Sequence, residues 1–223
     1  MAAPLEIVTI DGPSGAGKST ISQTLAAGLD YAYLDTGAMY RAVGLKVERS
    51  GIEEDDQTAL KQLLADIDLK LLAEGGETKV ILGGEDVSTL IRTPEMSMVA
   101  SRVSAIPAVR EKLTLLQREI GSRGGIVAEG RDMGTVVFPR AAWKFFLDAT
   151  PEERARRRVL QLQEQGQPVD EEETLRLIIE RDRADSSRAL APLVPAKDAI
   201  LVDSSKMTIV EVVSLMREKV EGR

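Results

Sequence analysis

Short apolar runs alternate with mixed apolar and polar stretches along most of the chain. The apolar runs rich in β-forming residues predict strands at 5–10, 31–34, 126–128, 143–147 and 199–202. Helical spacing of apolar residues predicts helices from about residue 18, and at 38–50, 55–64, 107–122, 151–165, 170–185 and 209–220. Strands that alternate with helices indicate an α/β fold with a parallel sheet covered on both faces.

One region breaks this alternation. Residues 68–72 and 78–82 alternate apolar and polar positions around a turn at 74–77, which predicts an antiparallel hairpin, and Gly83-Gly84 leads into another short extended piece. A hairpin inside a β/α pattern is typical of an inserted lobe and does not belong to the main sheet. We expect this lobe to lie between Arg41 and Ser101.

Composition limits the chemistry that the chain can perform. The 223 residues include no cysteine and no histidine, so catalysis has to rely on carboxylates, arginine, lysine, hydroxyls and backbone groups. The net charge is −7 and 3% of residues are aromatic, which argues against a nucleic-acid polymer as partner. No apolar segment approaches the length of a membrane span and no secretion signal is apparent. We therefore expect a cytoplasmic protein that does not associate with membranes.

The first predicted strand leads directly into a phosphate-binding loop. Gly12-Pro-Ser-Gly-Ala-Gly-Lys-Ser19 fits the pattern G-x-x-x-x-G-K-[ST], whose glycines let backbone N–H groups point at phosphate oxygens. Lys18 is placed to reach the β- and γ-phosphates, the Ser19 hydroxyl can bind Mg²⁺, and the following helix directs its positive end toward the anion. A Gly-rich turn without function is the alternative, but a strand before it and a helix after it favour a nucleotide site.

Other predicted strand ends and loops carry further motifs. Leu34-Asp-Thr-Gly-Ala-Met-Tyr-Arg41, Gly130-Arg-Asp-Met-Gly-Thr-Val-Val-Phe-Pro139 and Ala191-Pro-Leu-Val-Pro195 occur in this order after the loop. Together with the loop they resemble the bacterial cytidylate kinase family, over about residues 7–204. The Gly130 to Pro139 block is the most specific of these motifs.

The resemblance implies a nucleoside monophosphate kinase of the P-loop kinase fold, with a five-stranded parallel sheet. Residues 1–40 and 102–223 would form the core, with a short lid at about 151–166, and residues 41–101 would form the lobe that binds the monophosphate. The implied reaction is the ATP-dependent phosphorylation of CMP and dCMP to CDP and dCDP, with Mg²⁺ and with no covalent intermediate. The implied protein is a monomer.

The resemblance also implies roles for individual residues. Ser101, Arg110 and Asp132 look like the groups that read cytosine, since a carboxylate can accept from the N4 amine while donors face N3 and O2. The remaining contacts to CMP are implied for Thr36, Tyr40, Arg41, Arg131, Arg181, Asp185 and Arg188. Lys18, Arg131, Arg181 and Arg188 would stabilise the transferred phosphoryl group. ATP would bind to Gly12, Pro13, Ser14, Gly15, Ala16, Gly17, Lys18, Ser19 and Thr20.

Two parts of the site stay open at this level. The arginine run at 154–158 fits the lid, where at least one of Arg154, Arg157 and Arg158 is expected to meet ATP phosphates; we favour Arg157 and Arg158. Ser19 is the one assigned Mg²⁺ ligand, and either Asp35 or Glu129 can supply a supporting carboxylate. Asp11 is expected to be structural.

Two other functions compete with this interpretation. A P-loop kinase could act on another small acceptor, such as a different nucleoside monophosphate or a shikimate-like metabolite. A GTP-dependent switch protein would need an Asn-Lys-x-Asp guanine reader, and this chain contains no asparagine.

Overall fold

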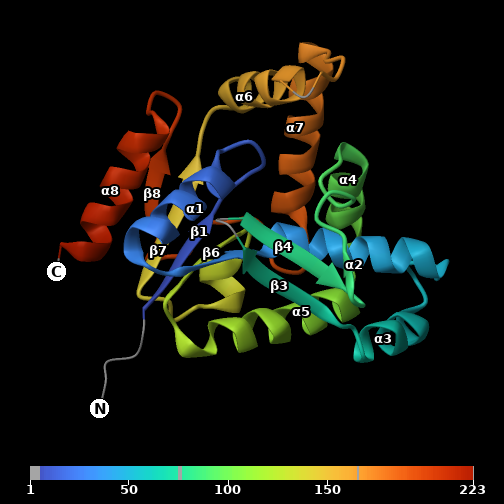
Figure 1. The fold of residues 1–223 in the computed structure, drawn as a ribbon. Coiled ribbons are helices and arrows are strands. Elements are labelled where there is room, and N and C mark those ends of the chain that lie inside the picture. Colours follow the sequence, from blue (N-terminus) through green and yellow to red (C-terminus); the bar gives the residue numbers. More distant parts are fainter. Residues whose placement is uncertain (1–5, 75–76, 165, 223) are drawn as a thin grey trace. The chain divides into compact units, whose positions relative to one another are not determined.

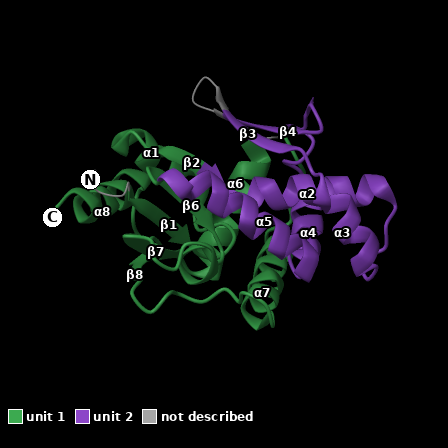
Figure 2. Cartoon of the chain, turned by 90° about the horizontal axis from the view of Figure 1, so that it is seen from below, with its two compact units in different colours: residues 1–33, 124–223 green, residues 34–123 purple. Residues whose placement is uncertain are grey.

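The computed structural model describes residues 6–74, 77–164 and 166–222. It divides into two compact units: Met1–Tyr33 with Gly124–Arg223, and Leu34–Arg123 (Figure 2). The phosphate-binding loop belongs to the first unit, and the predicted hairpin belongs to the second.

A five-stranded sheet has the strand order β2-β6-β1-β7-β8. Four of its strands, β1, β6, β7 and β8, belong to the first unit and can be followed in Figure 1, whereas β2 begins in the first unit and ends in the second. These strands are β1 (Ile7–Asp11), β2 (Ala32–Asp35), β6 (Ile126–Gly130), β7 (Trp143–Asp148) and β8 (Ile200–Asp203). The central strand β1 pairs in parallel with β6 and β7, and β7 pairs in parallel with β8. The predicted parallel α/β sheet is thus confirmed, and the carboxyl ends of β1, β6 and β7 meet at one edge.

Four helices accompany this sheet: α1 (Lys18–Leu29), α6 (Pro151–Glu164), α7 (Glu171–Ser187) and α8 (Ile209–Glu221). Apolar residues of β1 and β7 pack with α1 and α8 in a core that includes Ile10, Leu25, Phe145 and Met216. The last helix begins with a capping box in which Thr208 and Glu211 satisfy each other's backbone N–H groups. The helices expected here are confirmed, with shifts of one or two residues at their ends.

The second unit contains helices α2 (Thr36–Ser50), α3 (Gln57–Ala65), α4 (Pro94–Val103) and α5 (Pro107–Ile120), and the short 3₁₀ turn η1 (Gly121–Arg123). A separate sheet is formed by β3 (Leu69–Glu74), β4 (Glu77–Leu82) and β5 (Glu85–Asp86), all antiparallel. The predicted hairpin is therefore confirmed, although residues 75–76 of its turn lie outside the described residues. Its inner side packs Val80 and Leu82 with Ala38 and Ala42 of α2.

Two elements were not predicted. Helix α4 has Thr93 as its N-cap and Pro94 at its first position, a start signal that the sequence displays but that we did not use. The other is a π-helical turn, η2 (Met133–Val137), inside the Gly130 to Pro139 block. Its backbone is held by hydrogen bonds from Val137 to Asp132 and from Phe138 to Met133, which no local propensity predicts.

Candidate functional site

The phosphate-binding loop connects β1 to α1 in a geometry that only glycine permits. A Cβ atom on Gly12 would lie 1.9 Å from the carbonyl oxygen of Leu147, so any side chain would collide with the backbone of β7. Gly17 has a φ of 87° and is the N-cap of α1, which places Lys18 at the first position of the helix. The predicted strand, loop and helix are therefore confirmed.

Lys18 is buried beside the loop that it follows. Its Nζ donates to the carbonyl oxygen of Pro13 at 2.7 Å, and 8% of the residue is exposed. Burial and the positive charge of Arg131 lower the pKa of Lys18 to about 7, whereas the negative charges of Glu129 and Asp11 act in the opposite direction. The folded protein thus disfavours the charged form of Lys18 as long as no anion is bound to the loop. An anion bound to the loop would favour this charged form and would be stabilised by it.

Asp11, which precedes the loop, has a structural role, as predicted. Its two carboxylate oxygens accept the backbone N–H groups of Met133 at 2.8 Å and Gly134 at 2.7 Å. The side chain is buried, and this burial raises the pKa of Asp11 to about 6 against the opposing effect of both donors. Asp11 thus fixes the first turn of η2 to the end of β1.

The end of β6 supplies a second group of predicted residues. Arg131 donates from Nη1 to the carbonyl oxygen of Gly12 at 2.9 Å and from Nε to Asp185 at 2.9 Å. Asp132 follows it and is 3% exposed. The structure therefore brings Arg131 against the phosphate-binding loop, with Asp132 next to it in the chain.

Helix α7 contributes the third group. Arg188 donates to Asp185 at 2.6 Å, and Nη1 of Arg181 lies 3.4 Å from Oγ of Ser14. Burial opposes ionisation of Asp185, but the charges of Arg131 and Arg188 outweigh this effect and hold its pKa below the usual value. Asp185 therefore carries a negative charge that organises two of the predicted phosphate-binding arginines.

The arginines of α6 fall into different environments. Arg154 is 4% exposed and pairs with Asp182 of α7, which identifies it as part of the interior. Arg157 donates to Oγ of Ser204 at 3.1 Å and to its carbonyl oxygen at 2.7 Å, and its Nε pairs with Glu153. These contacts place Arg157 between α6 and the end of β8.

Arg156 and Arg158 point to different neighbours. Arg156 is exposed and shares Glu153 with Arg157, and the hydrogen bond from Arg156 is the main cause that lowers the pKa of Glu153 to about 2. Arg158 donates to the side-chain oxygen of Gln161, and within the described ranges it forms no ion pair. Burial lowers the pKa of Arg158, because no carboxylate compensates the lost hydration.

The other predicted residues belong to the second unit and lie on α2, α4 and α5. Asp35 caps α2 by accepting from the N–H of Ala38 at 2.8 Å, and Arg41 lies 3.5 Å from the same carboxylate. The guanidinium carbon of Arg110 lies 5.7 Å from the centre of the Tyr40 ring, which is a cation–π geometry. Arg110 also donates to the carbonyl oxygen of Ser104 at 3.0 Å.

Thr36 and Ser101 complete this second group. Thr36 is the first residue of α2 and is 2% exposed. Ser101 is half-buried in the last turn of α4, and its carbonyl oxygen accepts from the hydroxyl of Ser104. The structure thus gathers the predicted residues in two sets, one around the phosphate-binding loop and one on α2, α4 and α5.

Three residues of the first set were not anticipated in their observed roles. Asp182 and Ser204 form the contacts of Arg154 and Arg157, and Tyr33 donates to the carboxylate of Glu129. Asp182 could have been suspected, because it lies three residues before Asp185 on a predicted helix. The contact of Ser204 depends on tertiary packing and has no sequence signal.

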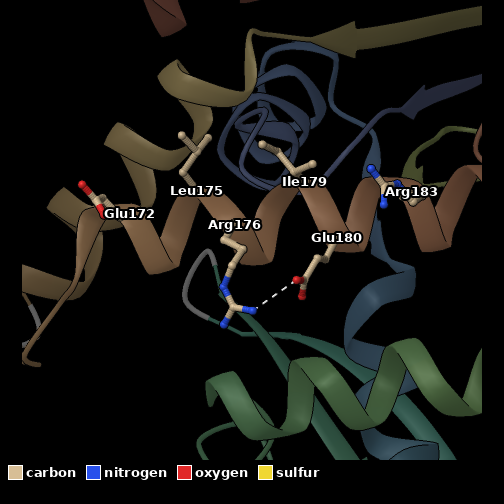
Figure 3. A pocket seen from close by; sticks show the side chains of 6 residues that line it. All are labelled: Glu172, Leu175, Arg176, Ile179, Glu180 and Arg183. Carbon is tan, nitrogen blue, oxygen red and sulfur yellow. Dashed lines mark hydrogen bonds and ion pairs between the residues drawn. The ribbon is translucent and has the colours of Figure 1, made fainter.

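One hollow of the described surface lies along α7 and contains none of the residues predicted for the site. A cavity of about 420 Å³ is lined by Glu172, Leu175, Arg176, Ile179, Glu180 and Arg183, all from α7 (Figure 3). Leu175 and Ile179 extend to one side of the helix, whereas Arg176 and Glu180 form an ion pair on the other side. Since none of the lining residues has an assigned role in the predicted site, and Arg176 and Glu180 pair with each other on the helix surface, this cavity does not alter the site.

In the described part of the chain, no helix is long and apolar enough to cross a bilayer. In the same ranges, no three acidic, histidine or cysteine side chains form a group that could hold a metal ion.

Comparison with known proteins identifies a family match over almost the whole chain. The family model described as cytidylate kinase matches residues 8–222. The cytidylate kinase of Syntrophotalea carbinolica is 51% identical over 217 residues, which cover 97% of this chain and 92% of that protein. The cytidylate kinase of Vibrio cholerae is 48% identical over 223 residues, covering 100% of this chain and 99% of the relative.

One solved structure also shares the fold. A crystal structure of an uncharacterised protein from Eubacterium ventriosum matches with a TM-score of 0.52 and 10% sequence identity. The match covers 98% of this chain and 99% of that one. At this identity the likeness concerns the fold alone.

Proposed function

Because the chain belongs to the cytidylate kinase family, we propose that it transfers the γ-phosphoryl group of ATP to CMP and dCMP, forming CDP and dCDP. The observation that carries this proposal is the position of Arg131. Its guanidinium bridges the loop carbonyl of Gly12 and the carboxylate of Asp185, and Asp132 is the next residue. This contact supports a position for Asp132, the proposed cytosine-reading carboxylate, one residue away from an arginine that binds the loop.

ATP is the phosphate donor and occupies the loop. The backbone N–H groups of residues 14–20 surround its phosphates, and Lys18 contacts the β- and γ-phosphates. Since the folded protein lowers the pKa of Lys18 to about 7, the negative phosphates restore the charged form when they bind. Protonated Lys18 thus contributes to the affinity for ATP, although burial disfavours this charged form when no anion is bound to the loop.

Mg²⁺ accompanies ATP, and the residues present fit such an ion. Ser19 is the second residue of α1 and is exposed, so its hydroxyl is accessible as an oxygen ligand. Glu129 is a buried carboxylate at the end of β6 whose charge acts on Lys18. Mg²⁺ in phosphate sites is commonly bound by one or two protein oxygens, phosphates and water, and it neutralises charge on the transferred group. We therefore prefer Glu129 over Asp35, which caps α2 in the other unit.

CMP is the acceptor, and its base is read by Ser101, Arg110 and Asp132. Asp132 accepts from the N4 amine of cytosine, and the serine hydroxyl and the guanidinium donate to its N3 and O2 acceptors. Uracil has an oxygen in place of this amine, so it would face the carboxylate with two acceptors and no donor. Such a mismatch costs about 1–3 kcal/mol in a closed pocket.

The phosphate and sugar of CMP are bound by a larger set. Asp185 binds a sugar hydroxyl, and Tyr40 packs on the monophosphate side. Thr36, Arg41, Arg131, Arg181 and Arg188 bind the phosphate groups or the sugar. This set requires residues 41–101 to act as the monophosphate-binding lobe, with residues 1–40 and 102–223 as the kinase core.

Phosphoryl transfer needs no general base. The attacking CMP phosphate oxygen is already an anion, so Lys18, Arg131, Arg181 and Arg188 act by drawing two anions into line and stabilising the transferred group. Direct in-line transfer follows from this arrangement, and no covalent intermediate on the protein is required.

The lid at about 151–166 completes the donor side through Arg157 and Arg158. Within the described residues Arg158 is paired with no carboxylate, and its half-buried charge is therefore available to an ATP phosphate. Arg157 is bound to Ser204 and Glu153 but remains 27% exposed, so it can contact ATP from the end of β8. Both assignments support closure of the lid over ATP.

The proposal extends to the setting of the enzyme. We assign it to the cytoplasm, where ATP and CMP are available, and expect a monomer with small nucleotides as its partners. Its net charge of −7 gives no support to a nucleic-acid polymer as a partner.

A panel of acceptors tests the proposed activity. We expect ATP-dependent turnover of CMP and dCMP with kcat/KM values at least tens of times those for UMP, AMP and shikimate. Turnover of AMP, UMP or shikimate far above CMP would reject the cytidylate assignment. Tight binding of GTP without phosphoryl transfer would indicate a switch protein instead.

Substitution of Asp132 tests how the base is read. An amide at this position can donate to the O4 oxygen of uracil, so Asp132→Asn should lower kcat/KM for CMP and reduce the preference for CMP over UMP by about tenfold or more. Glu119→Gln, an exposed acid on α5, serves as control and should leave the preference unchanged. An unchanged preference in Asp132→Asn would remove Asp132 from the base-reading set.

A further inference from the structure

Arg154 on α6 links three separate segments of the first unit. Its Nη2 pairs with Asp182 of α7 at 2.6 Å, and its Nη1 donates to the carbonyl oxygen of Ser14 in the phosphate-binding loop at 3.1 Å. Its Nε donates to the carbonyl oxygen of Ala149, which follows β7, at 2.9 Å. One buried guanidinium thus connects the loop, the start of α6 and α7.

The loop and α6 are also packed closely at this point. A Cβ atom on Gly15 would lie 3.1 Å from both Cβ and the carbonyl oxygen of Arg154. The side chain of Arg154 is 4% exposed, whereas those of Arg156 and Arg157 are 62% and 27% exposed. The carboxylate of Asp148 also lies 3.8 Å from Nε of Arg154. Arg154 could contact a phosphate only by leaving these partners, and this would leave acceptors in the interior unpaired.

A parallel arrangement exists three residues further along α7. Asp185 pairs with Arg131, which donates to the loop carbonyl of Gly12. In the same way, Asp182 pairs with Arg154, which donates to the loop carbonyl of Ser14. Residues three apart on a helix share a face, so α7 is joined to both ends of the loop's first turn through two arginines. The second oxygen of Asp182, Oδ1, is buried without a hydrogen-bond partner within the described residues. The ion pair with Arg154 is therefore the interaction that balances the negative charge of Asp182.

We propose that Arg154 is a positioning residue that sets the distance between α7 and the phosphate-binding loop and does not itself bind ATP. Arg181 precedes Asp182 in α7, and its Nη1 lies 3.4 Å from Oγ of Ser14, the residue whose carbonyl Arg154 holds. A shift of α7 would therefore displace Arg181 from the loop. Misplacement by about 1 Å is enough to cost about 100-fold in rate. The kinetic part of this inference rests on the proposed phosphoryl transfer.

Substitution of Asp182 separates positioning from direct binding. If Arg154 were an ATP ligand restrained by Asp182, Asp182→Asn would release it and tighten ATP binding. If Arg154 is a positioning residue, Asp182→Asn weakens the link and lowers kcat by about 10- to 100-fold. ATP affinity, measured by calorimetry, should then be equal or weaker. Tighter ATP binding, or an unchanged kcat, overturns the proposal.

Arg154→Lys provides the conservative partner variant. Lysine keeps the charge but cannot hold two carbonyls and a carboxylate at once, so a similar fall in kcat is expected. Both residues act through one link, so their effects should not multiply. The kcat of the double variant Arg154→Lys/Asp182→Asn should lie within about threefold of the kcat of the slower single variant. Independent, multiplicative losses would contradict the proposal. The matched control is Arg156→Met, an exposed arginine on the same helix, which should retain the wild-type kcat.

Hydrogen exchange gives a readout that requires no acceptor. The amides of residues 14–20 should exchange faster in Asp182→Asn and Arg154→Lys than in the wild-type protein, and should be unchanged in Arg156→Met. Unchanged protection in the first two variants overturns the positioning role even if CMP turns out not to be the acceptor. Failure of the wild-type protein to phosphorylate CMP, with faster exchange in these variants, would reject the proposed function and leave the link intact.

Discussion

At the scale of single residues, burial decides how the charged groups behave. Lys18 and Asp11 are neighbours of the same loop, and burial is the largest cause of the pKa shift of each, downward for Lys18 and upward for Asp11. Asp185 is also buried, yet its pKa is lowered because Arg131 and Arg188 face it. A carboxylate is thus kept charged or made easier to protonate according to its partners.

The lowered pKa of Lys18 predicts proton uptake when ATP binds. At pH 8 a lysine with a pKa of about 7 is about nine-tenths neutral, and the phosphates return it to the protonated form. ATP itself is fully ionised at this pH, since secondary phosphate groups have a pKa of about 6. Calorimetric titration in buffers of different ionisation enthalpy should therefore show an uptake approaching one proton. Lys18→Met should show none, and release of protons by the wild-type protein would contradict the shift.

Asp11 makes a testable contribution to stability. Asp11→Ala leaves the N–H groups of Met133 and Gly134 unpaired inside the protein, and should lower the free energy of unfolding by about 2–4 kcal/mol. Asp11→Asn keeps one acceptor and should cost less. Chemical denaturation of the three proteins measures these differences, and an unchanged stability of Asp11→Ala would contradict the assigned role.

The raised pKa of Asp11 also fixes the sign of a pH effect. The pKa of Asp11 is about 6 in the folded protein, whereas an ordinary aspartate carboxyl has a pKa of 3.8. Protonation of Asp11 therefore stabilises the folded state. This stabilisation is complete below about pH 3.8 and is lost as the pH rises through 6. Relative to Asp11→Asn, the wild-type protein should therefore become more stable as the pH falls from 6 to 4. The opposite trend would show that the carboxylate is stabilised in the fold.

At the scale of elements, the packing of helices depends on where glycine allows close contact. Gly44 of α2 faces Val99 of α4, and a Cβ atom there would lie 2.7 Å from Cγ1 of Val99. Valine in a helix has little rotamer freedom, so it cannot turn away. Gly28 of α1 differs, because the nearest atom to its Cβ position is the end of a flexible arginine at 3.8 Å.

These two glycines should respond oppositely to alanine. Gly28→Ala should raise the free energy of unfolding by about 0.5–1 kcal/mol, since alanine favours the helix and the position has room. Gly44→Ala gains the same propensity but overpacks the contact with α4, which costs about 1–3 kcal/mol. Adding Val99→Ala should recover part of this loss. Thermal denaturation distinguishes the variants, and equal stabilisation by both alanines would refute the packing argument.

At the scale of the whole molecule, composition and site agree on the type of chemistry. The chain contains no histidine, and the groups assembled at the loop are arginines, one lysine and acids. Such a set aligns and stabilises phosphates but offers no base that titrates near neutral pH in the substrate complex.

The pH dependence of turnover should reflect this composition. With ATP and CMP both saturating, Lys18 is held protonated by phosphate, so kcat should vary by less than about twofold between pH 7 and 9. Below about pH 6 the rate should fall as the CMP phosphate takes up its second proton. A basic limb in kcat centred between pH 7 and 8 would indicate that Lys18 loses its proton in the complex and would contradict this account.

Local patterns in the sequence predicted much of the fold. The apolar period and the glycines of the loop predicted β1, α1 and the parallel sheet, because these features depend on residues close in the chain. The hairpin of β3 and β4 was found for the same reason. Helix α4 was not predicted, although Thr93 and Pro94 form a typical helix N-terminal signal. The π-helical turn after Asp132 could not be predicted, since Asp11 holds it from more than 100 residues away.

The sequence by itself determined the phosphate-binding loop, the family motifs and the set of arginines, because residue type and spacing are sufficient for these. Only the tertiary structure separated the arginines by role. Arg154, Arg157 and Arg158 are equivalent in the sequence, yet Asp182 neutralises the first, Ser204 and Glu153 bind the second, and no carboxylate in the described residues pairs with the third. Their different environments arise because the charge that each arginine meets comes from segments that are distant in the chain.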